Sequence, residues 1–147
     1  MNDWIEVEPE VRRTEQKGPV RFGLRKYGDR RAKGVVLIKK EIIDQIGMKS
    51  WRVNVRIGRG ARAHQIAIVP DVEGRFELHE LGKIRGGGIF RVNFPVTDNF
   101  PDLQAPIIDR GFKIETEGKR TLIVIDLPPW CFDHAARKAY IETHSHA

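Results

Sequence analysis

Basic side chains gather in one stretch of this 147-residue chain. Residues 21–62 contain 13 Lys or Arg and three acids, a local charge of +10, whereas the whole chain carries +6 and the remainder therefore −4. Guanidinium and ammonium groups bind phosphate oxygens, and charge this one-sided is typical of proteins that bind a polyanion, most often nucleic acid. A solvated, arginine-rich face is the alternative. An anionic membrane surface is disfavoured, because no amphipathic helix accompanies the charge.

Nine of these cations are the expected nucleic-acid-binding residues. Those on the alternating stretch 51–57 can reach base edges if that strand enters a groove. Those flanking Gly60 offer two guanidinium groups to a phosphate, with a plain charged hairpin loop as the alternative. Those before residue 34 belong either to an arm along the nucleic-acid backbone or to an edge strand, which such charges protect from aggregation. The nine are Arg30, Arg31, Lys33, Lys39, Lys40, Arg52, Arg56, Arg59 and Arg62.

The residue types that perform catalysis form no convincing constellation. Cys131, Asp133 and His134 are close in sequence, but a nucleophilic site would need the start of a helix to aim all three together. Asp98 and Asp102 suit a divalent ion, as in a nuclease, although a solvated loop is the preferred interpretation. The two histidines of the C-terminal tail give too few ligands for a metal site. We therefore predict no catalytic residues, no metal and no cofactor. The five histidines are His64, His79, His134, His144 and His146.

Apolar patterns predict the elements that hold the cations in place. Residues 35–38 form a continuous apolar run, and Ile42, Ile43 and Ile46 follow at helical spacing before Gly47, a residue that readily ends a helix. Residues 51–57 then alternate apolar and polar, the pattern of a half-buried strand. A Gly-rich loop and a return strand at 65–69 complete a hairpin. Residues 34–70 are thus predicted to be strand, short helix, strand, loop, strand.

The remaining chain is predicted to be mostly strand. Further strands are expected at 20–27, 75–81 and 89–94, an extended piece at 107–108, and a hairpin of 111–117 with 120–127. Three glycines at 86–88 are interpreted as a linker or bulge, because the Lys-Ser/Thr ending of a phosphate-binding loop is missing. Asp133 is expected to cap a final helix over 134–142, with Ala135, Ala139 and Tyr140 facing the body. Cys131 is expected to be a buried small residue.

The two halves of the chain echo each other. Residues 35–38 resemble residues 90–93 at a shift of 55, and residues 66–70 resemble 123–127 at a shift of 57. Residues 51–57 correspond loosely to 110–116. A proline-rich connector, 95–106, takes the place of the first half's helix. An internal duplication is one interpretation, and the likeness that any two β-hairpin units share is the other.

The stretch 34–70 resembles the AbrB-like swapped-hairpin family of small bacterial DNA-binding regulators, which includes the MazE-type antitoxins. The family's motifs are matched by Ile38-Lys39-Lys40-Glu41-Ile42, Ile46-Gly47-Met48, Val53-Asn54-Val55 and Ile66-Ala67-Ile68-Val69-Pro70. The resemblance implies a barrel of interleaved hairpins, usually from two identical chains, that binds DNA through basic groups near a hinge helix. Lys39 stands in place of the family's proline and Ile43 in place of its usual helix arginine, so the DNA-binding cations are expected elsewhere. The overall layout also looks like small phage and prophage proteins.

These observations lead to one set of expectations. The fold class is mainly β, a small swapped-hairpin-type barrel, with a fused internal duplication as one form, one short internal helix and a C-terminal helix. The expected divisions are a basic N-terminal arm with a first strand (1–33), an AbrB-like unit plus an extra strand (34–81), a second, degenerate β unit (82–129), and a C-terminal helix and tail (130–147).

The expected function is binding of duplex DNA by a non-enzymatic transcriptional regulator or antitoxin-like factor. The alternative is a phage-type interaction or inhibitor module whose basic face binds an acidic protein. A monomer, in which the second half supplies the partner hairpin, and a homodimer both remain open. A cytoplasmic location is expected, because the lone cysteine cannot form an internal disulfide and no apolar run is long enough to cross a bilayer.

Overall fold

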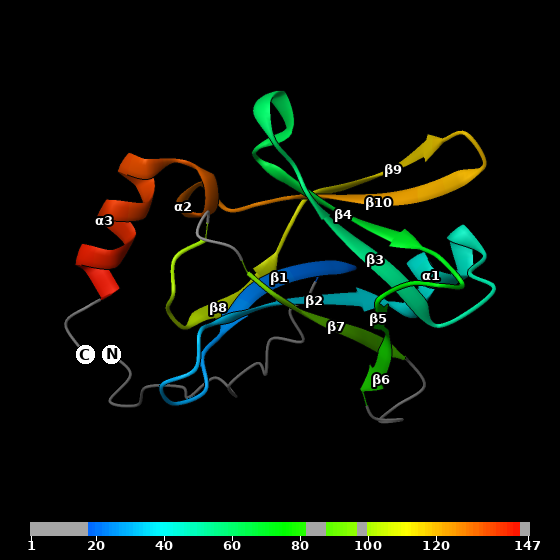
Figure 1. Cartoon of the computed structure of the whole chain (residues 1–147), viewed down its shortest axis with the longest axis horizontal. Helices are drawn as coiled ribbons and strands as arrows, with labels where there is room; N and C mark the ends of the chain where they lie inside the picture. Colours follow the sequence, from blue (N-terminus) through cyan, green and yellow to red (C-terminus); the bar gives the residue numbers. More distant parts are fainter. Residues whose placement is uncertain (1–17, 82–87, 97–99, 145–147) are drawn as a thin grey trace, which may run out of the picture.

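A computed structural model describes residues 18–81, 88–96 and 100–144. Two antiparallel sheets of five strands each make up the body, which confirms the mainly β prediction (Figure 1). The strands of sheet A, in spatial order, are β6 (His79–Leu81), β7 (Ile89–Pro95), β2 (Lys33–Lys39), β1 (Val20–Arg25) and β8 (Ala105–Asp109). Those of sheet B are β5 (Phe76–Glu77), β3 (Arg52–Ile57), β4 (Gln65–Pro70), β10 (Arg120–Asp126) and β9 (Phe112–Glu117). The helices are α1 (Lys40–Ile46), a 3-10 turn η1 (Gly60–Arg62), α2 (Pro129–Phe132) and α3 (His134–His144).

One hydrophobic core joins the inner faces of the two sheets. Alternate residues of β1, β2 and β7 meet alternate residues of β4 and β10 there, as period-2 patterning requires. Phe22 of β1 is fully buried, and its ring lies 6.5 Å from that of Phe94, 6.2 Å from that of Phe100 and 6.5 Å from that of Trp130. These rings attach the segment after β7 and the helix α2 to the sheets.

The internal helix forms and ends as the sequence predicts. Ile42 and Ile43 of α1 are buried, and Gly47 follows in the left-handed conformation with φ 64°. Its N–H donates to the carbonyl oxygens of Ile43 and Asp44, which satisfies groups left open at a helix end. The chain then turns back at Trp51 and enters β3 in the opposite sheet (Figure 1).

Each sheet takes one hairpin from each half of the chain. In sheet A, β1–β2 and β6–β7 meet through the pair β2·β7, and in sheet B, β3–β4 and β9–β10 meet through β4·β10. Gly23 pairs with Val35 in β1–β2, and the residues 56 positions later, His79 and Arg91, pair in the same way in β6–β7. The partner hairpins therefore come from the same chain, in matching register.

The register corrects the sequence alignment of the halves. The hairpins β1–β2 and β6–β7 match at a shift of 56 residues, not 55. A shift of 55 would align Ile38, which is buried, with Asn93, which is half-buried, whereas a shift of 56 aligns Ile38 with Phe94, which is also buried. The second hairpins match at 57 throughout, since the pair Val55↔Ile68 maps onto Phe112↔Ile125. The looser match of 51–57 to 110–116 was therefore two residues out of register.

Other details differ from prediction. The described strands form two separate sheets, one with edge strands β6 and β8 and the other with edge strands β5 and β9, rather than a closed barrel. Apolar–polar alternation along a strand is the same in a two-sheet sandwich and in a barrel, so the pattern alone does not distinguish these folds. The strand expected at 75–81 is split at buried Leu78, where the chain passes from sheet B to sheet A. Helix α2 was not predicted; it begins at Pro129, just after the hairpin expected to end at residue 127. Asp133 caps α3 by accepting from Ala135 N–H at 3.0 Å, as predicted.

The packing of α3 is partly corrected. Tyr140 stacks on Trp130 with ring centroids 4.8 Å apart, as its inward placement predicts. Ala135 and Ala139 are exposed, whereas Ala136 and Arg137 are half-buried, so the face of the helix turned to the body differs from the predicted one. Predictions for the N-terminal arm before residue 18, Gly86, Gly87, Asp98 and His146 lie outside the described residues.

Candidate nucleic-acid interface

The nine predicted cations fall in three places rather than on one continuous face. Arg30, Arg31 and Lys33 surround the turn between β1 and β2, whereas Lys39, Lys40 and Arg52 lie where β2 ends and β3 begins. A strand advances about 3.3 Å per residue, so the six steps of β2 separate these two groups by roughly 20 Å. Arg56, Arg59 and Arg62 belong to β3 and the loop that follows it, at the top of Figure 1.

The turn between β1 and β2 is held by two residues far away in the sequence. Asp102 accepts hydrogen bonds from Ala32 N–H at 2.7 Å and from Lys26 Nζ at 2.9 Å. Gln104 Oε1 accepts from Lys26 N–H at 2.8 Å. The Ala32 amide, with help from the Lys26 ammonium, lowers the pKa of Asp102 below its ordinary value. Residues 102–104 therefore hold both ends of the turn, at Lys26 and at Ala32.

Exposed cations and one aromatic ring project from this fixed turn. We call Tyr27, Arg30, Arg31 and Lys33 the hairpin tip. Gly28 takes the left-handed conformation with φ 54°, and Arg30 N–H donates to the Tyr27 carbonyl at 3.0 Å, which closes a tight turn. Tyr27 is 55% exposed, and the three cations are exposed as well. Arg30 and Lys33 make no ion pair with another residue of the described ranges.

Two arginines of the β3–β4 hairpin are neutralised by carboxylates of β9. Arg62 binds Glu115 with both terminal nitrogens, at 2.8 and 3.1 Å, and Arg56 Nη1 lies 3.0 Å from Glu117. The contact with Glu115 raises the pKa of Arg62, and the same contact lowers the pKa of Glu115. These ion pairs lie on the outer face of sheet B, beside an apolar strip of Val69, Leu122 and Val124. This face therefore offers little net positive charge to a polyanion.

The third group is mixed in charge and partly engaged. Arg52 is exposed, but its Nε donates to the Gly74 carbonyl at 2.8 Å, and its cross-strand neighbour is Glu77. Lys39 and Lys40 flank the start of α1, where Glu41 follows. Because carboxylates lie beside the cations here, the positive potential is weaker than at the hairpin tip, and a phosphate site is less favoured.

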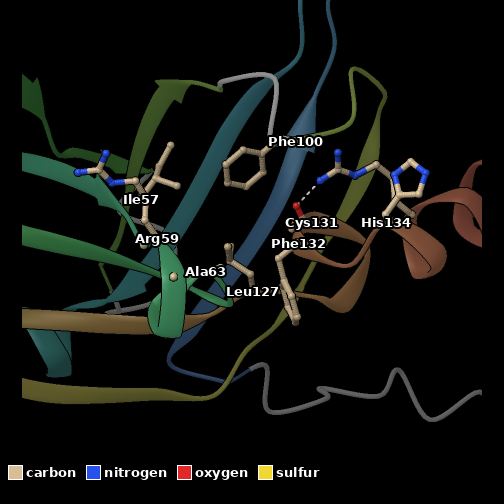
Figure 2. A pocket seen from close by; sticks show the side chains of 11 residues that line it. Ile57, Arg59, Ala63, Phe100, Leu127, Cys131, Phe132 and His134 are labelled. Atoms are coloured by element: carbon tan, nitrogen blue, oxygen red, sulfur yellow. Dashed lines mark hydrogen bonds between the residues drawn. The ribbon is translucent and has the colours of Figure 1, made fainter.

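A cavity lies between the β3–β4 loop and α2. Its volume is about 340 Å³, and Figure 2 shows Phe100, Leu127 and Phe132 between Arg59 on one margin and His134 on the other. Cys131 also lines it, and burial raises the pKa of its thiol to about 12. A thiol that stays protonated is a poor nucleophile, so the arrangement with Asp133 and His134 does not make a reactive cysteine.

The candidate acidic and metal-binding residues find other roles. Asp102 is occupied as the anchor of the hairpin tip, which was not foreseen from its loop position. In the part of the chain that the structure describes, no three His, Cys, Asp or Glu side chains lie close enough to hold a metal ion. Sequence reasoning also missed Tyr27; its position at the end of the strand expected at 20–27, directly before Gly28-Asp29, was the available signal of exposure.

Comparison with known proteins adds no relative. No family model, no curated protein and no solved structure matches the chain. Among the described helices, none combines the length and the apolar character needed to span a membrane.

Proposed function

We propose that this protein binds duplex DNA through the hairpin tip, as a transcriptional regulator or antitoxin-like factor. The observation that carries the proposal is the fixed turn that presents Arg30, Arg31 and Lys33 to solvent beside a half-exposed tyrosine. Arginine and lysine bound to phosphates release condensed counterions, and this release supplies most of the sequence-independent affinity for DNA.

The rigidity of the turn supports the same function. A flexible cationic loop loses conformational entropy when it binds, which reduces affinity. Here Asp102 and Gln104 already hold the ends of the turn, so the turn loses little conformational entropy on binding. Tyr27 adds a ring that can contact a sugar or a base beside the phosphates.

The proposed interface is narrower than the nine residues of the sequence prediction. Arg56 and Arg62 are left out, because binding DNA would require them to give up Glu117 and Glu115. Arg59 remains a candidate, since its side chain is exposed and engages no other described residue. A cytoplasmic location belongs to the proposal, and it rests on the single, buried cysteine.

Fluorescence anisotropy of a labelled duplex, titrated with the protein at several salt concentrations, tests the proposal. We expect binding at low salt and a steep linear fall of log K with log salt. A poly-glutamate peptide of similar length serves as the control for unspecific charge attraction. Absence of duplex binding at low salt refutes the proposal, and tighter binding of poly-glutamate than of duplex favours an acidic protein as the partner.

A further inference from the structure

The walls of the cavity between the β3–β4 loop and α2 suit a flat apolar group. Ile57 and Leu127 lie on its sheet side, and Phe100 and Phe132 contribute aromatic rings (Figure 2). Phe132 is 42% exposed and its ring meets that of His64 edge-on, with the ring centroids 6.1 Å apart, whereas Phe100 is buried. An aromatic ligand entering the cavity would cover the exposed face of Phe132 and gain both burial and ring contact.

The margins of the cavity favour a negative charge on that ligand. Arg59, His134 and Arg137 are the ionisable side chains around the opening besides the protonated Cys131, and its lining includes no carboxylate. Arg137 already donates to the carbonyl oxygens of Trp130 and Cys131, so it fixes α2 and adds a positive field rather than a direct contact. Arg59, on the opposite loop, is an exposed cation of the lining, and a guanidinium group can bind a phosphate with two hydrogen bonds.

The same chain segment connects the cavity to the hairpin tip. Phe100 forms a wall of the cavity, and Asp102, two residues later, accepts hydrogen bonds from both ends of the turn. Phe100 and Asp102 thus belong to one short segment, which contributes both to the wall of the cavity and to the support of the tip. Binding at the tip and binding in the cavity would therefore both act on this stretch of chain.

We propose that this cavity accommodates one unpaired nucleotide of a bound strand, with the base against Phe132 and Phe100 and the phosphate at Arg59. The inference rests on the proposed DNA binding and deepens it. Stacking on an aromatic side chain tolerates any base, so the site distinguishes unpaired from paired nucleotides rather than one sequence from another.

The test compares a fully paired duplex with the same duplex carrying one extrahelical nucleotide, and with a third in which that nucleotide is abasic. We expect the protein to bind the bulged duplex about 10-fold more tightly than the other two, a preference within the range measured for one stacked base. Phe132→Ala should remove the preference and leave the affinity for the paired duplex unchanged. Arg59→Gln should reduce the preference by weakening the phosphate contact.

Trp51→Ala is the matched control, because Trp51 is also a large exposed aromatic residue, 51% exposed, but lies at the start of β3, away from the cavity. It should retain the bulge preference, and circular dichroism should show that all variants are folded. Equal affinity for all three duplexes, or a preference that survives Phe132→Ala, overturns the inference while leaving the proposed function standing. Failure to bind any of the duplexes overturns both.

Discussion

The sharpest consequence of the structure concerns which cations control the salt dependence of DNA binding. Replacing Arg30, Arg31 and Lys33 with glutamine removes three exposed charges of the hairpin tip and lowers the net charge from +6 to +3. Each lost phosphate contact reduces the slope of log K against log salt by about 0.9, so the slope should fall by about 2.7. Between about 50 and 200 mM salt, three contacts of this kind account for a roughly 40-fold fall in affinity.

A control variant with the same charge separates location from net charge. Arg56→Gln, Arg62→Gln and Lys119→Gln together also bring the net charge to +3, but two of these residues are paired with carboxylates and the third lies at the β9–β10 turn. We expect this variant to lose far less of the slope than the tip variant, as measured by anisotropy on the same duplex. Equal losses in the two variants would refute the reasoning, because affinity would then depend on total charge and not on the hairpin tip.

Three further predictions concern the fold that presents the tip and the cavity. The pKa of Asp102 is lowered by the Ala32 amide, so its stabilising contact is fully present above the ordinary carboxyl pKa and is lost as pH falls through the lowered value. The protection factor of the Ala32 amide, which compares its hydrogen-exchange rate with the intrinsic rate at the same pH, should therefore fall on acidification, and an unchanged protection factor would contradict the contact. Cys131, with its pKa raised to about 12, should react with a thiol reagent only after denaturation. The free energy of unfolding should decline as pH rises from the ordinary thiol pKa toward that value, because only the unfolded thiol loses its proton in this range. Rapid labelling of the folded chain would contradict the burial of this thiol. Gly34→Ala places a Cβ against the ring of Phe94, closer than real Cβ contacts, and should lower the free energy of unfolding by about 1–3 kcal/mol in urea titration. An unchanged midpoint would contradict this packing.

Local patterns were sufficient to predict most elements of the fold. The alternation around Val53 and Val55, and the left-handed glycine at 47, are properties of neighbouring residues, and both appear in the structure as β3 and the end of α1. The burial predicted for Cys131, the lone cysteine of the chain, is confirmed as well. Alternation does not say whether sheets close into a barrel, because inward and outward residues alternate in either case.

The interface could not be predicted to the same depth, because it depends on contacts between distant residues. Arg56 and Arg62 meet carboxylates 61 and 53 residues further along the chain, so a count of charge in 21–62 overstated the positive field of their face. The anchor at Asp102 lies 76 residues from Lys26, and its oxygen atoms appeared in the sequence only as a candidate metal ligand in a loop. Strand pairing brings such residues together, and the hydrophobic pattern of one strand does not reveal its partners.

The repeated architecture explains why tip and cavity lie where they do. The two pairs of hairpins match at shifts of 56 and 57, so the connector between them is only one residue longer in the second half. The first connector, between β2 and β3, forms α1, which packs Ile42 and Ile43 on the core. The second connector, between β7 and β9, runs through Phe100 and Asp102 before it forms β8. The part of the second half that has no counterpart in the first is thus the part that anchors the tip and walls the cavity. The matched hairpins form the common body of the two sheets, and the divergent connector contributes the residues on which the proposed tip and cavity sites depend.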